Sequence, residues 1–517
     1  MLELVCKESF HNWNMPKRFG RHWQKIVLKC KFLPLAVKAM ACLLCEDTNL
    51  RNWEKILKHD VWELEPSHFG NEKYILPALK LSYDHLQSQL KQCFAYCCIF
   101  PKGYLFDKNE LVKLWLAEGY IKPVATDKIE ETGSCYFEEL LKRSFFQPLD
   151  VNDKEKCNMH DLYHDLAKSV SSFCQQLEES KSISIKPDTR HISFSGKDTQ
   201  KLAEEVLIAQ KLRTLLLPTP AAKDFGKMLD KMLRTLSCLR VLDLSSSTIK
   251  YLPDSIGKLK LLAHLDLSRT EIRALPDTIC NLRNLQILKL LGCLWLWELP
   301  KDLCNLKNLQ YLELDDIFWY KCSALPPRIG GITNLHNLHA FHVRQESGYG
   351  MKELQFMKNL EGILHIFNLE NSDDATSAEL KEKENISGLV LEWSNKDADQ
   401  QERIVQERVL EHLEPHHGLQ KLQINHFRGN QFSSWMGILH NLKEVSLNHC
   451  INCRLLSLGP LPHLRVLRIK GMLELEQWPE TMYESLIRLS ISNCPLLAKL
   501  PGNFPSLKVA KIKNVMH

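Results

Sequence analysis

The chain has 517 residues and a mass of 60.0 kDa, which is more than one ordinary hydrophobic core supports, so we expect several domains or a repeat array. Hydrophobic residues make up 44% and charged residues 25%, which excludes wholesale disorder. The 67 basic and 62 acidic residues leave a net charge of +5, too small for a protein whose main task is non-specific nucleic-acid binding.

The N-terminal segment and the 18 cysteines bear on the compartment. The first ten residues carry acids and lack a basic region followed by an apolar run, so they do not form a signal peptide. The most apolar stretch, residues 26–45, is interrupted by Lys29, Lys31 and Lys38, whereas a membrane span needs about 20 mostly apolar residues. We therefore expect a cytoplasmic protein without a membrane segment, whose thiols are reduced and largely buried.

Residues 1 to about 180 show helical periodicity. Residues 111–116 place apolar side chains in a helical pattern, and Gly119 follows where a helix can end. A second amphipathic run occupies residues 129–147. We expect a third helix to follow Asn158, whose side chain can cap a helix N-terminus.

From about residue 190 the periodicity changes to that of a leucine-rich repeat. Units of the form Leu-x-x-Leu-x-Leu, spaced by 21–24 residues, begin at Leu239, Leu262, Leu285 and Leu309, and return at Leu419, Leu442, Leu464, Leu486 and Leu507. One such unit cannot bury its own leucines, so neighbouring units must stack and share a core. Within the degenerate stretch 340–415, residues 389–393 predict one more strand, and residues 396–402 predict a polar loop.

The positions between the leucines face outward on the concave side of such a solenoid. In the four regular early repeats these positions hold four acids and one base, and in the last five they hold six bases and one acid. The face is therefore predicted to run from acidic to basic, and a partner would dock with complementary polarity. The residues that we expect to bind a partner are Asp243, Asp266, Glu313, Lys421, Arg468, Lys470 and Arg488. The alternative is a solvated surface of mixed charge.

Two further patterns raise the question of a metal site. The pairs Cys42/Cys45 and Cys450/Cys453 have zinc-ligand spacing but lie about 400 residues apart, so buried, unliganded thiols are the preferred interpretation. Residues 160–165 place two histidines and two aspartates at helical spacing, but nothing nearby supplies further ligands. We therefore expect neither a metal nor a catalytic residue.

Three ordered motifs give the chain a family resemblance. Cys30-Lys-Phe-Leu-Pro-Leu-Ala36, Cys93-Phe-Ala-Tyr-Cys-Cys-Ile-Phe-Pro-Lys-Gly-Tyr104 and Met159-His-Asp161 resemble motifs of plant nucleotide-binding, leucine-rich-repeat immune receptors of the coiled-coil type. In that family these motifs belong to the helical and winged-helix parts of the nucleotide-binding (NB-ARC) module. The resemblance implies an α/β multidomain chain with a helical remnant at 1–85, a winged-helix domain at 86–180 and a leucine-rich-repeat solenoid at 190–517.

The resemblance also implies a function. A member of this family is a defence receptor that holds ADP at rest, is switched by exchange, and uses its repeats to sense a pathogen effector or a guarded host protein. By position, Pro34 would pack on the adenine and His160 would face the β-phosphate at a helix N-terminus. Helix initiation by Pro34 and capping by His160 are the alternatives.

The chain departs from the family at two points. The first motif of the family begins with glycine where this chain has Phe32, and no Gly-x-x-x-x-Gly-Lys-Ser/Thr phosphate loop occurs. We therefore expect an N-terminally truncated recognition and regulatory fragment that is not an enzyme and binds ADP or ATP weakly or not at all.

Two alternative functions remain from the sequence. One is an intact nucleotide-driven switch, completed by a partner or a longer transcript. The other is a DNA-binding winged helix, but Lys108, Lys113, Lys142 and Arg143 form no dense basic stripe, so we expect no nucleic-acid partner.

Overall fold

The computed structural model describes residues 20–44, 49–63, 77–122, 129–150, 155–178, 184–196, 199–217, 225–315, 325–372, 375–501 and 504–515. The chain divides into two compact units, Met1–Ile249 with Leu261–Asp266, and Lys250–Lys260 with Leu267–His517. In the described part of the chain, no helix combines the length and the apolar character needed to cross a bilayer.

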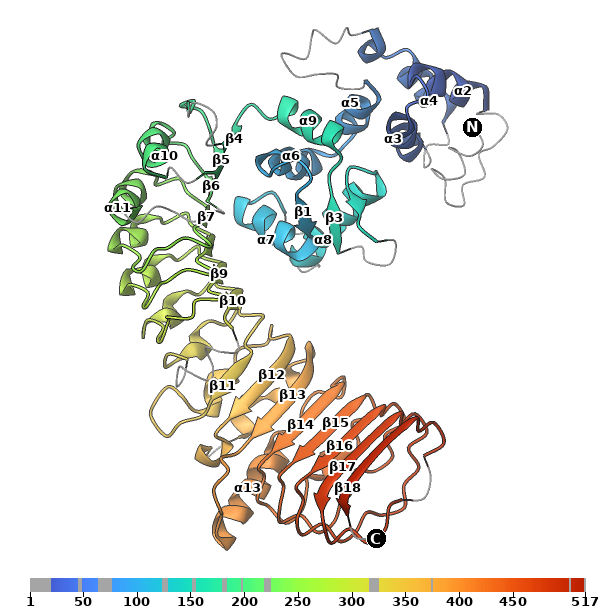
Figure 1. Cartoon of the computed structure of the whole chain (residues 1–517), viewed down its shortest axis with the longest axis vertical. Helices are drawn as coiled ribbons and strands as arrows, with labels where there is room; N and C mark the ends of the chain where they lie inside the picture. Colours follow the sequence, from blue (N-terminus) through green and yellow to red (C-terminus); the bar gives the residue numbers. More distant parts are fainter. Residues whose placement is uncertain are drawn as a thin grey trace. The chain divides into compact units, whose positions relative to one another are not determined.

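The first unit begins with a small helical group (Figure 1). Its helices are α2 (Gly20–Lys29), α3 (Pro34–Leu44), α4 (Leu50–Leu57) and α5 (Pro77–Asp84). Their apolar faces meet around Trp23 and Trp53, whose rings lie edge to face with centroids 6.5 Å apart. Burial of two such rings contributes a large part of the stabilisation of a core this small.

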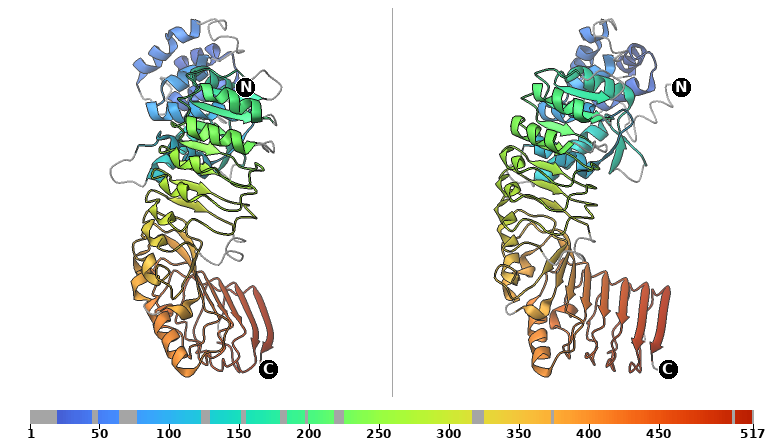
Figure 2. Two further views of the ribbon diagram at one scale, coloured as in Figure 1. Left: turned by 90° about the vertical axis from the view of Figure 1, so that its left-hand side faces the viewer. Right: turned by 60° about the vertical axis from the view of Figure 1, so that its left-hand side comes forward.

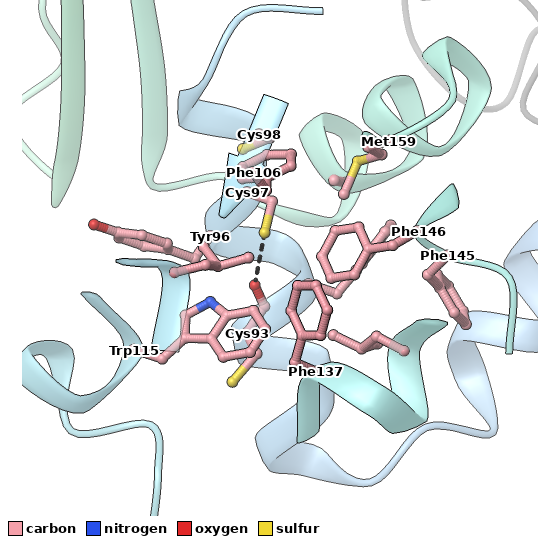
Figure 3. Close-up of a cluster of buried hydrophobic side chains, with 14 of the residues drawn as sticks. Cys93, Tyr96, Cys97, Cys98, Phe106, Trp115, Phe137, Phe145, Phe146 and Met159 are labelled. Carbon is pink, nitrogen blue, oxygen red and sulfur yellow. Dashed lines mark hydrogen bonds between the residues drawn. The ribbon is translucent and has the colours of Figure 1, made fainter. Parts of the chain in front are cut away.

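A winged-helix region follows in the same unit. It consists of α6 (Ser88–Tyr96), α7 (Lys108–Glu118), α8 (Ile129–Lys142), α9 (Asp161–Val170) and an antiparallel sheet in the order β1 (Leu105–Asp107), β3 (Lys156–Asn158), β2 (Gln147–Pro148). Figure 3 shows its core, in which Trp115, Phe137 and Phe146 pack around the Cys93–Cys98 turn. The Cys97 thiol donates to the Cys93 carbonyl across 3.3 Å. The motif at 93–104 thus supplies the centre of this core.

The ends of two helices test the sequence predictions. Helix α7 stops at Gly119, whose φ of 77° is the left-handed conformation that glycine tolerates, as predicted. The predicted cap of α9 is wrong, because Asn158 lies in β3 opposite Leu105. His160 caps the helix instead, since its Nδ1 accepts the Leu162 N–H.

The first repeats complete the unit. The parallel strands β4 (Cys174–Glu178), β5 (His191–Ser195), β6 (Thr214–Leu216), β7 (Val241–Asp243) and β8 (His264–Asp266) pair in sequence order, with α10 (Thr199–Glu205) and α11 (Phe225–Thr235) between them. Helix α7 packs against β7 and β8, and Leu216, Val241 and Ala263 belong to the winged-helix core. The winged-helix region and these repeats therefore share one hydrophobic core.

The second unit is a solenoid of parallel strands. Strands β9 (Ile287–Lys289) and β10 (Tyr311–Glu313) pair with each other, and eight further strands form a sheet in sequence order. These are β11 (Ala340–His342), β12 (Gly362–Phe367), β13 (Ile386–Glu392), β14 (Lys421–Asn425), β15 (Glu444–Asn448), β16 (Val466–Lys470), β17 (Arg488–Cys494) and β18 (Val509–Val515). In Figure 2 the orange-to-red strands run side by side. The predicted strand at 389–393 is confirmed as β13.

The predicted loop at 396–402 is wrong at its end, where α13 (Gln400–His412) begins. Asp399 accepts the Glu402 N–H, and the Glu402 carboxylate accepts the Asp399 N–H. This reciprocal capping box starts a helix within a polar sequence that carries little apolar periodicity.

Asparagines join successive turns of the solenoid. The side-chain amides of Asn284, Asn308 and Asn334 donate to backbone carbonyls one repeat earlier, at N···O distances of 2.7–3.0 Å. Each bond pairs a carbonyl in the turn before a strand. The stacking of the repeats is therefore fixed by side-chain hydrogen bonds as well as by inward leucines.

Candidate functional sites

Pro34 begins α3 directly after a turn in the left-handed backbone region. Lys31 and Phe32 have φ values of 51° and 57°. This region costs a residue with a side chain about 1–2 kcal/mol, which glycine avoids, so the turn explains why the resembling family has glycine at the position of Phe32. Pro34 itself lies at the first helical position, where its missing N–H costs nothing. Adenine packing by Pro34 stays a prediction.

His160 is exposed and caps α9, with 3.1 Å between its Nδ1 and the Leu162 nitrogen. A phosphate at a helix N-terminus binds through backbone N–H groups, and the imidazole already occupies one of them. His160 and a phosphate would therefore compete for the Leu162 N–H, and weak or absent nucleotide binding stays a prediction. No step of a nucleotide cycle follows from this geometry, and contact between His160 and a β-phosphate stays a prediction.

The histidine–aspartate pattern on α9 is used structurally. His164 is buried, and its Nε2 lies 2.8 Å from the Phe100 carbonyl. Asp165 pairs with Lys102. Within the described ranges, no group of three or more His, Cys, Asp or Glu side chains could hold a metal ion.

The second Cys-x-x-Cys pair is a pair of buried thiols. Cys450 and Cys453 have no exposed surface, and burial raises the pKa of Cys450 to about 12. The Cys453 thiol donates to the Gly429 carbonyl across 3.2 Å. The fifteen described cysteines are all free, and most are buried, whereas Cys45 of the first pair lies outside the described residues.

A buried cluster of Glu118, Thr214, His191 and Tyr120 joins the winged-helix region to the first repeats. Thr214 donates to Glu118 Oε1, and its Oγ1 lies 3.1 Å from His191 Nδ1. The Tyr120 hydroxyl lies 3.2 Å from His191 Nε2. A consistent proton arrangement has Tyr120 donating to His191, His191 to Thr214, and Thr214 to Glu118. The backbone carbonyl of Glu118 also accepts from Arg240 across 2.8 Å.

Burial shifts the pKa of both titratable groups at the centre of this cluster toward the neutral form. Burial is the largest influence on Glu118 and raises its pKa to about 7, although Thr214, Arg240 and Arg213 oppose it. Burial, together with Arg213 and Arg190, lowers the pKa of His191 to about 3. Because His191 is neutral at neutral pH, the 3.7 Å between its Nδ1 and Glu118 Oε1 is not an ion pair.

The cluster occupies the concave face of the first repeats. His191, Thr214, Val241 and His264 form one row across β5–β8, and each is buried. Asp266, on the neighbouring row, is 8% exposed. The sequence did not reveal that α7 covers this part of the concave face, because Glu118 and Thr214 are almost 100 positions apart. The one available signal was Glu118 itself, an acid at the end of an otherwise apolar helical stretch.

The structure places the other two predicted acids as follows. Asp243 is half-buried and accepts the Ser245 N–H across 2.8 Å. Glu313 lies 3.7 Å from Lys289 on the neighbouring strand. Partner binding by Asp243, Asp266 and Glu313 stays a prediction.

The predicted basic residues lie on the concave face of the eight-stranded sheet. Strand register places Lys421, Glu444 and Arg488 in one row, and Arg468 and Lys470 in the next two. Glu444 pairs with Arg468 and lies 3.9 Å from Lys421. Lys470 and Arg488 are exposed, and no ion pair joins either to an acid among the described residues.

A polar chain crosses the same face and was missed from the sequence. Its members are His365, Glu392, Asn425 and Asn448, one from each of β12–β15. His365 and Asn425 donate to Glu392 Oε2 at 3.0 Å and 2.8 Å, and Asn448 donates to Asn425 at 2.9 Å. Burial disfavours the Glu392 carboxylate, but these two hydrogen bonds and the nearby His365 and His426 together outweigh it and lower its pKa. His365 and Glu392 lie on β12 and β13 in the degenerate stretch, where repeat spacing gives no guide to register.

Comparison with known proteins defines the class of the chain. Residues 99–167 match the winged-helix domain of disease resistance proteins, residues 190–296 match a leucine-rich-repeat region, and residues 351–472 match the R13L1/DRL21 leucine-rich repeats. The chain is therefore similar to the winged-helix domain of disease resistance proteins in one part and to leucine-rich repeats in two others.

Particular relatives are similar over most of this chain. Disease resistance protein RGA2 of Solanum bulbocastanum is 40% identical over 453 residues, covering 86% of this chain and 43% of RGA2. RGA4 of the same species is 37% identical over 496 residues, covering 95% of this chain and 46% of RGA4. The disease resistance protein At3g14460 of Arabidopsis thaliana is 38% identical over 498 residues, covering 90% of this chain and 34% of that protein. The chain thus spans a third to a half of the length of these relatives.

Proposed function

We propose that this chain is the recognition and regulatory part of a plant innate immune receptor, which binds other proteins and catalyses no reaction itself. Its similarity to disease resistance proteins supports the receptor role. We also propose that residues 1–85 represent the helical part of a nucleotide-binding module. A cytoplasmic location is supported by the free, mostly buried thiols of the described residues.

One observation carries the recognition role. On strands β14–β17, the concave face presents mostly polar and charged side chains in register, while the alternate side chains of the same strands are buried. A rigid sheet holds such a surface without the ordering cost that a loop would incur on binding. The partner would be a pathogen effector or a guarded host protein.

The buried cluster supports the regulatory role. Glu118 belongs to the winged-helix region, and Thr214 and His191 belong to the first repeats. A change at the repeats can therefore bias the position of α7, because a buried hydrogen-bonded network has few alternative arrangements.

Charge pairing argues against a DNA-binding winged helix. Lys108 pairs with Glu138 at 2.7 Å and Lys113 with Glu110 at 3.1 Å. Arg143 pairs with Glu139 at 2.5 Å. Cations already balanced by acids release few counterions from DNA, so this region is a poor phosphate-binding surface.

Site-specific photocrosslinking in leaf tissue tests the recognition role. A photoreactive amino acid replaces Ser490, at the centre of the concave face of β17, and in a matched variant replaces Arg283, exposed on a different face of the repeats. We expect protein adducts from the Ser490 position and few from the Arg283 position. Equal yields at both positions, or adducts mainly with nucleic acid, would contradict the proposal.

A further inference from the structure

The charges of the concave face are segregated along the eight-stranded sheet. Glu392, half-buried and fixed in the polar chain, supplies a carboxylate on β13. Lys470 on β16, Arg488 on β17, and Lys511 and Lys513 on β18 form an exposed cationic patch. In the described part of the chain, no acid pairs with these four cations, since Glu444 is engaged by Lys421 and Arg468.

The strand register gives the distances between the Glu392 carboxylate and the cations of the patch. Glu392, Asn425, Asn448, Lys470, Ser492 and Lys513 lie on one row, each on the next strand. With neighbouring strands about 4.8 Å apart, Lys470 lies about 14 Å and Lys513 about 24 Å from Glu392. An extended chain advances about 3.3 Å per residue, so these distances correspond to about four and seven residues.

The surroundings of the patch distinguish between two kinds of polyanion. Binding of single-stranded nucleic acid relies on aromatic side chains on which bases stack. The outward positions of β15–β18 hold no aromatic residue, and serines such as Ser490 and Ser492 lie between the cations. Small hydroxyl donors beside cations fit carboxylates of a peptide better than the faces of bases.

We propose that this face binds an extended protein segment of segregated charge, with a basic residue at Glu392 and acidic residues, beginning about four positions away, on the cationic patch. The inference rests on the proposed recognition role and specifies the chemistry of the partner. The rigid polar chain holds the Glu392 carboxylate in place, and its lowered pKa keeps it charged at neutral pH.

Fluorescence anisotropy with labelled ten-residue peptides and the full chain tests the proposal. One peptide carries an arginine followed four residues later by three glutamates, and a second has the same composition with the arginine among the glutamates. We expect the segregated peptide to bind about three- to tenfold more tightly, because each exposed ion pair contributes about 0.2–1 kcal/mol. Binding should weaken with salt.

Three variants separate the contribution of Glu392 from that of the cationic patch. Glu392→Gln keeps a hydrogen-bond acceptor for Asn425 and should remove the preference for segregated charge while leaving binding to an all-acidic peptide. Lys470→Glu with Arg488→Glu should abolish binding of both peptides, whereas the matched pair Lys258→Glu with Arg283→Glu, exposed elsewhere on the repeats, should not.

Three outcomes would overturn the inference. These are equal affinity for the two peptides, tighter binding of a thymidine decanucleotide than of either peptide, and loss of binding in the matched Lys258/Arg283 variant. If no peptide binds while Ser490 still crosslinks to proteins, the charge pattern is wrong and the recognition role stands. If both measurements fail, the recognition role fails as well.

Discussion

Glu118→Gln offers a direct test of the buried cluster. Glu118 as a residue is 2% exposed, and its pKa of about 7 in the folded chain compares with 4.5 for an unperturbed glutamate. The unfolded chain therefore loses the proton near pH 4.5, and the folded chain retains it until about pH 7. Wild-type stability falls as the pH rises through this window, by about 3 kcal/mol in total at 1.36 kcal/mol per unit.

Glutamine is a neutral isostere of the protonated acid, and its amide oxygen can still accept from Thr214. The variant should match the wild type near pH 4.5 and be more stable above pH 7. For a unit of roughly 250 residues, about 3 kcal/mol corresponds to a gain in Tm of about 6–12 °C. His191 titrates in both proteins: its pKa is lowered to about 3, so both lose stability as the pH falls from about 6.5.

Differential scanning calorimetry at about pH 5 and about pH 8 measures this difference. Glu138→Gln is the matched control, because this acid is largely exposed in its ion pair with Lys108. The Glu138→Gln substitution should change Tm little, and by the same amount at both pH values. A Glu118→Gln variant that is less stable than the wild type at about pH 8 would show that Arg240 and Arg213 keep the carboxylate ionised, and the argument from burial would then be wrong.

Two smaller substitutions test local geometry. Phe32→Gly should raise stability by up to about 1 kcal/mol, because it removes the strain of a left-handed backbone conformation and loses only a largely exposed side chain. Leu33→Gly is the control and should lower stability, because Leu33 lies outside the left-handed region. Thermal unfolding of the two variants checks the sign. Asn308→Ala should cost about 0.5–1 kcal/mol, because it removes an exposed hydrogen bond to the Arg283 carbonyl that water can partly replace. Faster amide exchange in β10 but not in β18 would locate the damage.

The local fold could be predicted well from the sequence. Leucine spacing determined the repeats, because a unit that cannot bury its own leucines has to stack on the next. It also determined which side chains of β14–β18 face outward, since strand periodicity is two. Helix α7 and its end at Gly119 followed from apolar periodicity and from the freedom of glycine at positive φ.

Capping and register in irregular segments were harder to predict. The prediction of Asn158 as the α9 cap is wrong because that residue belongs to strand β3. The start of α13 differs from the predicted loop because a capping box, and not apolar periodicity, begins this helix. The polar chain begins with His365 and Glu392 on β12 and β13, in a stretch without regular spacing. Nucleotide contacts of Pro34 and His160 remain predictions from resemblance.

Apolar periodicity predicts a leucine-rich solenoid preceded by helical segments, because burial of periodic apolar residues is a local requirement. Which concave positions are open follows from three-dimensional packing. In the early repeats Thr214 and His191 are buried, and Thr214 donates to Glu118 of α7, whereas in the later repeats Lys470 and Arg488 are exposed. Contacts between residues a hundred positions apart depend on packing geometry, which no local pattern encodes.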